Sequence, residues 1–553
     1  MNTNKKWEIC NKSHISSLGS QKEIDQLISI LLENRGLKTK KDQDTFLHPD
    51  IATVTPESIG IDKKHVTKTL QRIQKAIDND EEIIIFGDYD VDGIAGTAIL
   101  WETLNHKKAK VLPYIPSRIG EGYGLSVKSI ENILQQYPRT KLIITVDNGI
   151  VANSAVDFAN KNGIDVIITD HHLPSSILPK AQAIFHSTKL CGTGVAWVLS
   201  RLVDNFDNDH LALVALATVA DLVPLQNANR AVLVAGLEIL HATKRPGIAA
   251  LCEEAKIEQA AIGVYEIGHM LGPRINAMGR ISHAMDSLRL LCTKDRLKAK
   301  VLAEKLGLTN TDRQELTRDL SLYAITKAKN KKDRLLFLSD KKYDEGVIGL
   351  VAGKLVETYY RPSIVVAIGE KISKASARSV AGFNIIEFIR KAEHLLLNAG
   401  GHPMAAGFTV STEKITLLEN FLAEKIKDAL SEGLLIRTLK IDCELPLSFV
   451  SQNVYDGLQQ LSPFGMGNPE PCFVSKNVII ENVKTVGKDG LHLKLALRDE
   501  KKQVQMQAIA FGLGEMVKSL TTGKKVHIVY TVDENIWNNK KSLQLKIRDI
   551  QIT

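Results

Sequence analysis

The feature that most constrains this chain is a regular alternation of short apolar segments with helix-like segments between residues 82 and 172. The apolar segments "EIIIFGD", "AKVLPYIP", "KLIITVDNG" and "DVIITDHH" have the length and the β-branched content of strands. The segments between them place apolar residues at helical spacing. Strands that are apolar throughout and alternate with helices predict a parallel sheet covered on both faces. We therefore expect an α/β domain built around that sheet.

The rest of the sequence predicts further parts around this domain, because 553 residues are too many for one hydrophobic core. Long polar helical segments come next, and "RLLFLSD" and "SIVVAIG" then predict a second α/β unit. Several short strand-like segments from about residue 436 onward predict a small β-barrel. The expected parts are a helical lead-in at 1–60, the first α/β domain at 61–240, a helical connector at 241–330, the second α/β domain at 331–432 and the barrel at 433–553.

The composition disfavours several classes of protein. Hydrophobic residues make up 44% of the chain and charged residues 24%, as in ordinary globular proteins. Apolar runs such as "LALVALATVA" are too short to span a membrane, and "MNTNKKWEICNK" contains no apolar signal segment, so we expect a cytoplasmic protein without a membrane partner. The six cysteines form no CxxC pair, which argues against a disulfide framework or a zinc site. No GxGxxG or P-loop motif follows a predicted strand.

The net charge of +8 is spread unevenly along the chain. Residues 1–240 carry 25 basic against 28 acidic side chains, whereas residues 241–434 carry 30 against 23 and residues 435–553 carry 16 against 12. An acidic first part followed by basic later parts suits a metal site beside a surface that binds a polyanion. Random variation in surface charge is the alternative explanation.

Polar side chains gather where the predicted strands of the first domain end. They are Asp88, Asp90, Asp92, Asp147, Asp170, His171 and His172, and the apolar helix "ALATVADLVPL" adds Asp221. A single aspartate after a strand is usually a helix cap or a turn residue. Three strand ends with such residues require a common explanation, because ligands of open parallel sheets bind beyond the carboxyl ends of the strands.

A divalent metal explains this gathering. Carboxylates so close together would raise one another's pKa unless a positive charge lay among them. Several carboxylates with one or two imidazoles suit Mn²⁺, or Mg²⁺ with fewer histidine contacts. A cluster this rich can hold two ions, which stabilise the attacking and the leaving oxygen on phosphorus. The residues alone therefore favour hydrolysis of a phosphoester.

Four motifs resemble, in this order, the signature of the DHH phosphoesterase superfamily: "DYDVDG", "VDNG", "TDHH" and "ATVADLVPL". Five later segments resemble the RecJ family within it: "LGPRINAMGR", "EGVIGLVAGKL", "ARSVAGFNI", "NAGGHPMAAGF" and "LSPFGMGNPEP". The resemblance covers nearly the whole chain, and the ordered set of motifs is far more specific than "DHH" alone.

The resemblance implies a 5′→3′ exonuclease that degrades single-stranded DNA to nucleotide 5′-monophosphates in recombination and repair. It implies Mn²⁺ or Mg²⁺ as cofactor, with two ions expected. The implied architecture is a DHH domain, a long connecting helix, a DHH-associated α/β domain and a C-terminal barrel of the oligonucleotide-binding (OB) type. A monomer is expected, with a single-strand binding protein and a helicase as possible partners beside the DNA.

The resemblance also implies roles for individual residues. The favoured metal ligands are Asp90, Asp147, His171 and Asp221, followed by Asp92 and Asp88. His172 is expected to contact the scissile phosphate or to support a neighbouring residue. The residues expected to organise the site or contact DNA are Arg274, Asn276 and Arg280. The residues expected to hold the 5′ phosphate are Ser376, Arg378, Gly400, Gly401 and His402, since glycines admit backbone N–H groups and arginine grips an anion bidentately.

Two departures from the family pattern stand out. The segment at 184–193 is shorter than usual and lacks the common Asn-Pro, and Tyr343-Asp344 stands where Trp-His is common. The first would reshape the rim of the groove, and the second removes an imidazole that could contact substrate. Neither changes the metal set, so we expect activity.

Two other functions stay open from the sequence. A DHH phosphodiesterase for short oligonucleotides or cyclic dinucleotides would share the metal site, although such proteins generally lack the barrel. A non-catalytic scaffold would have lost metal ligands, whereas every ligand position is filled here. The sequence also leaves open which of Asp88, Asp90 and Asp92 face the metals, because alternate residues of an extended chain point in opposite directions.

Overall fold

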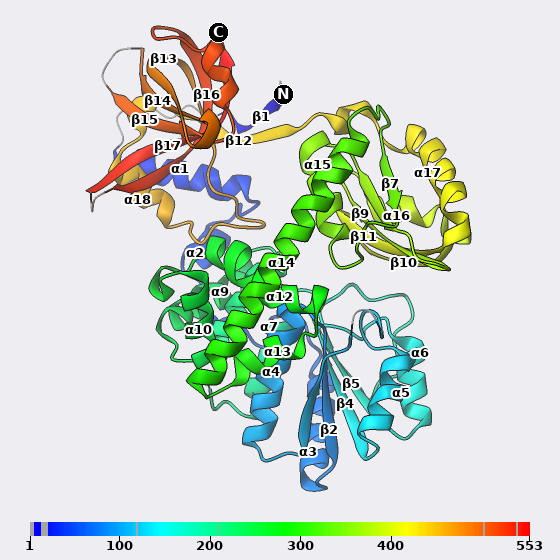
Figure 1. Ribbon diagram of the computed structural model, residues 1–553. Helices are drawn as coiled ribbons and strands as arrows, with labels where there is room; N and C mark the ends of the chain where they lie inside the picture. Colours follow the sequence, from blue (N-terminus) through cyan, green and yellow to red (C-terminus); the bar gives the residue numbers. More distant parts are fainter. Residues whose placement is uncertain (1–4, 13–19, 118–119, 208, 501–503, 538–539) are drawn as a thin grey trace.

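The computed structural model describes residues 5–12, 20–117, 120–207, 209–500, 504–537 and 540–553. It confirms the predicted architecture of a parallel-sheet domain, a long connecting helix, a second α/β domain and a barrel (Figure 1). In the described part of the chain, no helix combines the length and the apolar character that crossing a bilayer requires.

The first domain is built on a five-stranded parallel sheet with the order β3-β2-β4-β5-β6. The strands are β2 (Glu82–Gly87), β3 (Val111–Tyr114), β4 (Thr140–Val146), β5 (Asp165–Asp170) and β6 (Ala183–His186). The inner strands are buried on both faces, which explains why their sequences are apolar throughout. Strand β6, with only four residues, was not predicted.

Helices cover both faces of this sheet. The helices are α3 (Lys63–Asp78), α4 (Val91–His106), α5 (Val127–Gln136), α6 (Asn153–Lys161), α7 (Gly192–Val203) and α8 (His210–Ala220). Ile83 and Ile85 of β2 point into a core shared with α3, α4, α7 and α8, whereas Ile84 and Phe86 point into a core shared with α5 and α6. The alternation along one strand therefore serves two separate cores.

The predicted connector does not form a separate unit. Its helices include α9 (Asn227–Ala242), α10 (Pro246–Ala255), α12 (Gly272–Ile281), α13 (Met285–Cys292) and α14 (Arg296–Ala328). The hydrophobic core of the first domain continues through these helices as far as Leu306. Helix α14 has 33 residues and therefore spans about 50 Å. Its second half leaves the first domain and carries the second one (Figure 1).

The second domain has a mixed sheet with the order β10-β11-β9-β8-β7. The strands are β7 (Leu336–Asp340), β8 (Ser363–Ala367), β9 (Ile372–Arg378), β10 (Leu396–His402) and β11 (Ala405–Ser411), and the helices are α15 (Ile348–Tyr359), α16 (Ile385–Arg390) and α17 (Ile415–Ala429). Only β7 and β8 are parallel. The sequence did not predict β9, β10 or β11, because glycine, alanine and serine dominate them and strand propensity is weak there.

The third part is a closed five-stranded barrel, in which β13, β14, β15, β17 and β16 pair in a ring and β16 returns to β13. Its strands are β13 (Phe473–Val486), β14 (His492–Arg498), β15 (Gln505–Ala510), β16 (Lys525–Trp537) and β17 (Lys540–Ile552). Leu493, Leu495 and Leu497 alternate into its core, as the period of two requires.

The N-terminal segment differs from the expected helical lead-in. Strand β1 (Lys6–Asn11) pairs in parallel with β12 (Thr438–Glu444), which in turn pairs with β13 of the barrel. Helices α1 (Gln21–Asn34), α2 (Lys40–Leu47) and α18 (Gln452–Gln459) pack on the barrel core. Strand β1 escaped prediction because its partner lies more than 400 residues away in the sequence.

A buried arginine joins the barrel to the first domain. Arg230, on α9, is 2% exposed and donates hydrogen bonds to the carbonyl oxygens of Phe46, Leu461 and Ser462. The N–H of Leu225 also donates to the carbonyl of Met466, at 2.7 Å. The "LSPFGMGNPEP" segment at 461–471 is therefore a docking segment between the barrel and the first domain.

Candidate active site

The three aspartates after β2 do not form an extended strand. Helix α4 begins at Val91, and Asp90 is its N-cap, whose Oδ1 accepts from the N–H groups of Asp92 and Gly93 at 3.0 and 3.1 Å. A Cβ at Gly93 would overlap the backbone of Asp88, so this turn accepts only glycine. The strand thus ends in a tight turn that directs all three carboxylates toward the same edge of the sheet.

Asp92 has a second partner that the sequence did not reveal. Its Oδ2 and Oδ1 accept from the N–H groups of Gly192 and Thr193, both at 2.7 Å, at the N-terminus of α7. The side chain is 1% exposed. Asp92 therefore ties α7 to α4 and compensates orphan N–H donors of that helix, in addition to facing the site.

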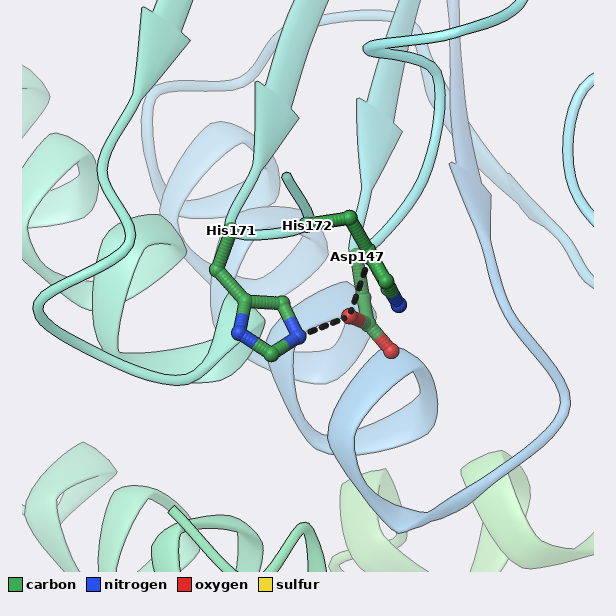
Figure 2. A group of neighbouring side chains, drawn as sticks. All are labelled: Asp147, His171 and His172. Atoms are coloured by element: carbon green, nitrogen blue, oxygen red, sulfur yellow. Dashed lines mark ion pairs between the residues drawn. The ribbon is translucent and has the colours of Figure 1, made fainter. Parts of the chain in front are cut away.

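Asp147 and His171 form the centre of the cluster. Asp147 ends β4 with φ at 63°, in the left-handed region that aspartate tolerates better than most residues. Its Oδ1 lies 3.1 Å from His171 Nε2 and 3.8 Å from His172 Nδ1 (Figure 2). His171 Nε2 also lies 3.5 Å from Asp221 Oδ2 and 3.7 Å from Asp92 Oδ2. Four separate elements therefore meet at one imidazole nitrogen.

The possible ligand atoms form overlapping groups, each within 4.8 Å. One group is Asp88, Asp90 and Asp147, a second is Asp92, His171 and Asp221, and a third is Asp147, His171 and His172. Asp147 and His171 each occur in two groups, so the groups share residues and form one continuous cluster. All three aspartates of "GDYDVDG" reach the cluster, and they divide between the first and second groups.

The electrostatics of the cluster fit a divalent cation. Burial, together with the charges of Asp92, Asp90 and two further carboxylates, raises the pKa of Asp147 well above its ordinary value. Burial and the charges of Asp92 and Asp90 raise the pKa of Asp221 to about 9. In the described part of the chain, no lysine or arginine forms an ion pair with Asp90, Asp92, Asp147 or Asp221. Carboxylates and imidazole are the donor set for Mn²⁺ or Mg²⁺.

Asp170 supports the site and was not assigned a role from the sequence. Its carboxylate accepts from the N–H groups of Ile150, His171 and His172 and from His172 Nδ1, at 2.7–3.1 Å. Burial alone would raise its pKa, but the hydrogen bond and charge of His172 lower it below the ordinary value. Asp170 is thus fully occupied as an acceptor and fixes the turn that presents both histidines.

Tyr123 is a second residue that sequence reasoning missed. Its hydroxyl lies 3.0 Å from His172 Nε2, and its ring packs edge-on against Tyr89 with 6.1 Å between centroids. Desolvation of the hydroxyl and the carboxylates of Asp88 and Asp147 raise the pKa of Tyr123, so the hydroxyl keeps its proton although the side chain is 57% exposed. The sequence pattern that could have indicated Tyr123 is "GEGYGLS", in which a tyrosine lies between glycines in the loop that follows β3.

Helix α12 contacts the site through part of its motif. Asn276 Oδ1 accepts from the N–H of Val91, at 2.9 Å, and so holds the start of α4. Arg280 donates to the carbonyl of Gly346 in the second domain, at 3.2 Å. Arg274 instead pairs with Glu254 and donates to the carbonyl of Met270. The structure thus brings Asn276 to the cluster, extends Arg280 across the domain boundary, and places Arg274 in an ion pair among helices.

Two of the residues expected in the second domain, Ser376 and Arg378, lie beside the start of α15. Ser376 and Arg378 lie on the same face of β9, and a Cβ at Gly349, in the first turn of α15, would lie 3.1 Å from Ser376 Oγ and 3.4 Å from Arg378 Nη2. Burial lowers the pKa of Arg378, and no acidic side chain pairs with it among the described residues. A half-buried guanidinium beside a helix N-terminus is suited to an anion.

The β10–β11 turn faces the first domain through His402. Gly401 has φ at 139°, and a Cβ there would overlap the carbonyl oxygen of Ala405, whereas Gly400 borders open space. The ring of His402 lies parallel to that of His172, with 6.0 Å between centroids and 23° between planes. The two domains therefore meet where the histidine pair of one faces the histidine of the other.

Comparison with protein families matches three consecutive parts of the chain. Residues 82–219 match the DHH family N-terminal domain, residues 332–430 match the DHHA1 domain, and residues 441–549 match the RecJ OB domain. The order is the order of the domains described above.

Whole-chain comparisons point in the same direction. The chain is 34% identical to the single-stranded-DNA-specific exonuclease RecJ of Bacillus subtilis, over 99% of this chain and 71% of that protein. It resembles the crystal structure of RecJ from Thermus thermophilus in complex with Mn²⁺, with a TM-score of 0.84 and 27% identity over 100% of this chain and 80% of that one. The Mg²⁺ complex of the same protein gives a TM-score of 0.77 and 26% identity, over 100% and 79% of the two chains.

Proposed function

The chain belongs to the RecJ family, and on that premise we propose that it is a metal-dependent exonuclease that degrades single-stranded DNA from the 5′ end to nucleotide 5′-monophosphates. The observation that carries the proposal is the buried cluster of carboxylates and imidazole at the strand ends, which His402 of the second domain faces, with Arg378 in register with His402 across β11. The first provides a place for phosphoester hydrolysis, and the second provides a place for a terminal phosphate.

We propose that Asp90, Asp147, His171 and Asp221 hold the metal, with Asp88 and Asp92 completing the set. Asp90 uses Oδ1 as the helix cap, which leaves Oδ2 for a cation. Mn²⁺ or Mg²⁺ held by these residues, with two ions expected, would supply positive charge to stabilise the attacking and leaving oxygens on phosphorus.

The two histidines have different roles in this proposal. His171 faces the carboxylates through Nε2, whereas His172 has both ring nitrogens engaged, Nδ1 with Asp170 and Nε2 with Tyr123. His172 is therefore held by Asp170 and Tyr123 and acts as a positioning residue beside His171. Of the two roles expected for His172, these contacts favour support of a neighbouring residue over direct contact with the scissile phosphate.

We propose that the second domain holds the 5′ phosphate. Arg378 and Ser376 supply side-chain donors, Gly401 allows the backbone to approach, and the His402 ring stacks on that of His172 at the metal cluster. A strand end fixed at this place puts the first phosphodiester bond near the metal cluster, which explains release of one nucleotide at a time.

The proposal gives each part of the chain a role. The metal site belongs to 61–240, the phosphate pocket to 331–432 and strand binding to the barrel in 433–553, while 1–60 and 241–330 hold these parts together. We further propose that the protein works as a monomer in the cytoplasm. Single-strand binding protein and a helicase are its proposed partners, since both act on single strands.

Polarity and substrate length test this proposal together. With Mn²⁺, a strand labelled at its 5′ end should release labelled mononucleotide from the start, whereas the same strand labelled at its 3′ end should shorten progressively. Blunt duplex should be degraded far more slowly. Mononucleotide release from the 3′ label first would refute the polarity, and activity confined to strands of a few nucleotides would favour the oligonucleotide phosphodiesterase instead.

A further inference from the structure

An exposed strip of apolar and aromatic side chains lies between the metal cluster and the barrel. It consists of Leu222, Tyr265, His269 and Met466, of which Leu222 and Tyr265 are 64% exposed and Met466 is 53% exposed. We propose that nucleobases of the single strand stack on this strip after the strand leaves the metal cluster. The inference rests on the proposed function and names the side chains that bind bases between the active site and the barrel.

The strip is formed where three segments of the chain meet. The N–H of Leu225 donates to the carbonyl of Met466, at 2.7 Å. A Cβ at Gly465 would lie 2.6 Å from Leu225 Cδ1 and 3.5 Å from Val264 Cγ1. The exposed side chains of the strip belong to these same three segments. One segment comes from the metal site, one from the helices that follow it and one from the docking segment of the barrel.

The strip begins at the metal cluster. Leu222 directly follows Asp221, a proposed metal ligand at the end of α8, and has φ at 58°. A left-handed conformation is uncommon for a large apolar residue, and glycine is the usual residue at this place after a helix. Neither helix termination nor packing explains a leucine here with most of its side chain in solvent. Contact with an external apolar group explains it.

Tyr265 and His269 already form the beginning of a stack. Their ring centroids are 4.6 Å apart, and the ring planes are inclined by 17°. His269 Nδ1 donates to the carbonyl oxygen of Tyr265, at 3.2 Å, which fixes the orientation of the imidazole. Because only one face of Tyr265 lies against His269, the exposed area of the tyrosine includes its other face. A nucleobase can extend this stack, and every base has a face suited to it.

The backbone beneath the two rings lies against the helix that leads to the metal cluster. The π-helical segment η3 (Ile267–Leu271) continues directly into α12. A Cβ at Gly268 would lie 3.8 Å from Val219 Cγ1, and a Cβ at Gly272 would lie 3.6 Å from Ala220 Cβ, in the last turn of α8. Turns of π-helix are rare and occur frequently at functional sites. The two rings therefore lie on a backbone that is packed beside the cluster.

The composition and size of the strip favour bases over other occupants. The strip contains no lysine or arginine, so it offers stacking and apolar contact and does not offer ion pairs to phosphates. Each partner of a stable protein complex buries about 800 Å², which is more than four side chains supply. In the proposed function, the strand passes from the metal cluster to the barrel, and the strip lies between them.

Strands with abasic sites test this inference. Affinity for a 5′-phosphorylated single strand of about 16 nucleotides would be measured by fluorescence anisotropy, with chelator present to prevent hydrolysis. Tyr265→Ala should weaken binding about fivefold or more, with unchanged salt dependence because no phosphate contact is lost. An abasic site at the stacking position near the 5′ end should weaken wild-type binding by a similar factor. The same abasic site should have little effect on Tyr265→Ala.

Two control variants separate stacking from folding and from general apolar contact. Tyr265→Phe keeps the ring and should bind like wild type. Leu297→Ala shortens a side chain that is 79% exposed on α14, outside the strip, and should also bind like wild type. Wild-type affinity in Tyr265→Ala, or an equal loss in Leu297→Ala, would overturn the inference. Abasic sites that weaken wild type and Tyr265→Ala equally at every position would also overturn it.

Failure of the proposed function gives a different result. Absence of Mn²⁺-dependent mononucleotide release by the wild type would refute the exonuclease. Binding in chelator does not depend on hydrolysis, so the position-specific abasic effect would still show whether the strip stacks on bases.

Discussion

At the scale of single residues, the sequence predicted the chemistry of the site better than the arrangement of its atoms. Carboxylates and histidines at strand ends predicted a metal cluster because parallel strands present their carboxyl ends at one edge. The individual roles of Asp90 and Asp92 could not be predicted. They depend on a helix that starts at Val91 and on Gly192, 100 residues away.

Asp221 is predicted to destabilise the metal-free chain. Its folded pKa of about 9 exceeds the ordinary value of 3.8, so the folded chain binds a proton that the unfolded chain releases. Stability in chelator should therefore fall as pH rises from about 4 to 9. Asp221→Asn should not show the loss of stability that Asp221 causes as pH rises. The variant should therefore melt at a higher temperature than wild type at pH 8, with little difference near pH 4.

Asp92→Asn is the matched comparison for that experiment. An amide oxygen replaces only one of the two acceptors that bind Gly192 and Thr193, so this variant should lose about 1–3 kcal/mol in chelator. Excess Mn²⁺ should raise the melting temperature of wild type above that of Asp221→Asn. Equal melting of all three proteins in chelator would contradict the assigned charges and contacts.

Tyr123 is predicted to act through His172. Tyr123→Phe keeps the ring and removes the hydroxyl that hydrogen-bonds to His172 Nε2, so kcat should fall about 10-fold to 100-fold, as for other supporting partners of a metal site, with KM nearly unchanged. Tyr265→Phe, at an exposed tyrosine, is the control. A proportional rise in KM with unchanged kcat would mean that the tyrosine binds substrate and does not position the histidine.

At the scale of elements, long periodic segments were predicted well and short or small-residue strands were not. The four apolar strands from β2 to β5 and the polar helix α14 follow from the periodicity of their own sequences. Strands β9 to β11 carry Ser376, Arg378 and Gly401, which we propose to hold the 5′ phosphate, and the glycines and alanines of these strands give them little strand propensity. Such strands depend on tertiary pairing, which a local pattern does not contain.

A buried ion-pair network holds the helices of the first domain together. Glu102 on α4 binds Arg245 through both carboxylate oxygens, at 2.9 and 2.6 Å, and lies 3.0 Å from His210. The nearby Asp207 would complete a set of possible metal ligands, but Arg245 already supplies the positive charge at 3.5 Å. We therefore assign this cluster a structural role.

The stability that this ion-pair network provides should decrease at low pH. Burial would raise the pKa of Glu102, but hydrogen bonds from His210 and Arg245 lower it from 4.5 to about 2. The ionised Glu102 carboxylate therefore stabilises the folded state fully above about pH 4.5, and this stabilisation is lost as pH falls toward 2. Glu102→Gln should destabilise the protein by about 1–3 kcal/mol at pH 7, because the buried Arg245 loses its bidentate partner and keeps Asp209 and Asp207. The difference in melting temperature from wild type should shrink below pH 4.5, and a constant difference would contradict this.

At the scale of the whole molecule, the order of the domains could be predicted from the sequence, but the contacts between the domains could not. The docking of the barrel depends on Arg230 and three carbonyl groups, and on a β1 strand paired across more than 400 residues. These contacts hold the barrel against the first domain while α14 holds the second. In the proposed function, a single-stranded DNA that reaches the metal cluster therefore contacts all three domains.

The central claim is that this cluster hydrolyses single-stranded DNA with a bound metal, and Asp147→Asn tests it most directly. Asparagine also tolerates the left-handed backbone at this position, so circular dichroism should show an intact fold. On a 5′-labelled single strand with Mn²⁺, wild type should release labelled mononucleotide, and chelator should stop it. Asp147→Asn should be slower by about 1,000-fold or more, the equivalent of several kcal/mol. Wild-type rates in the folded variant, or undiminished release in chelator, would contradict the account.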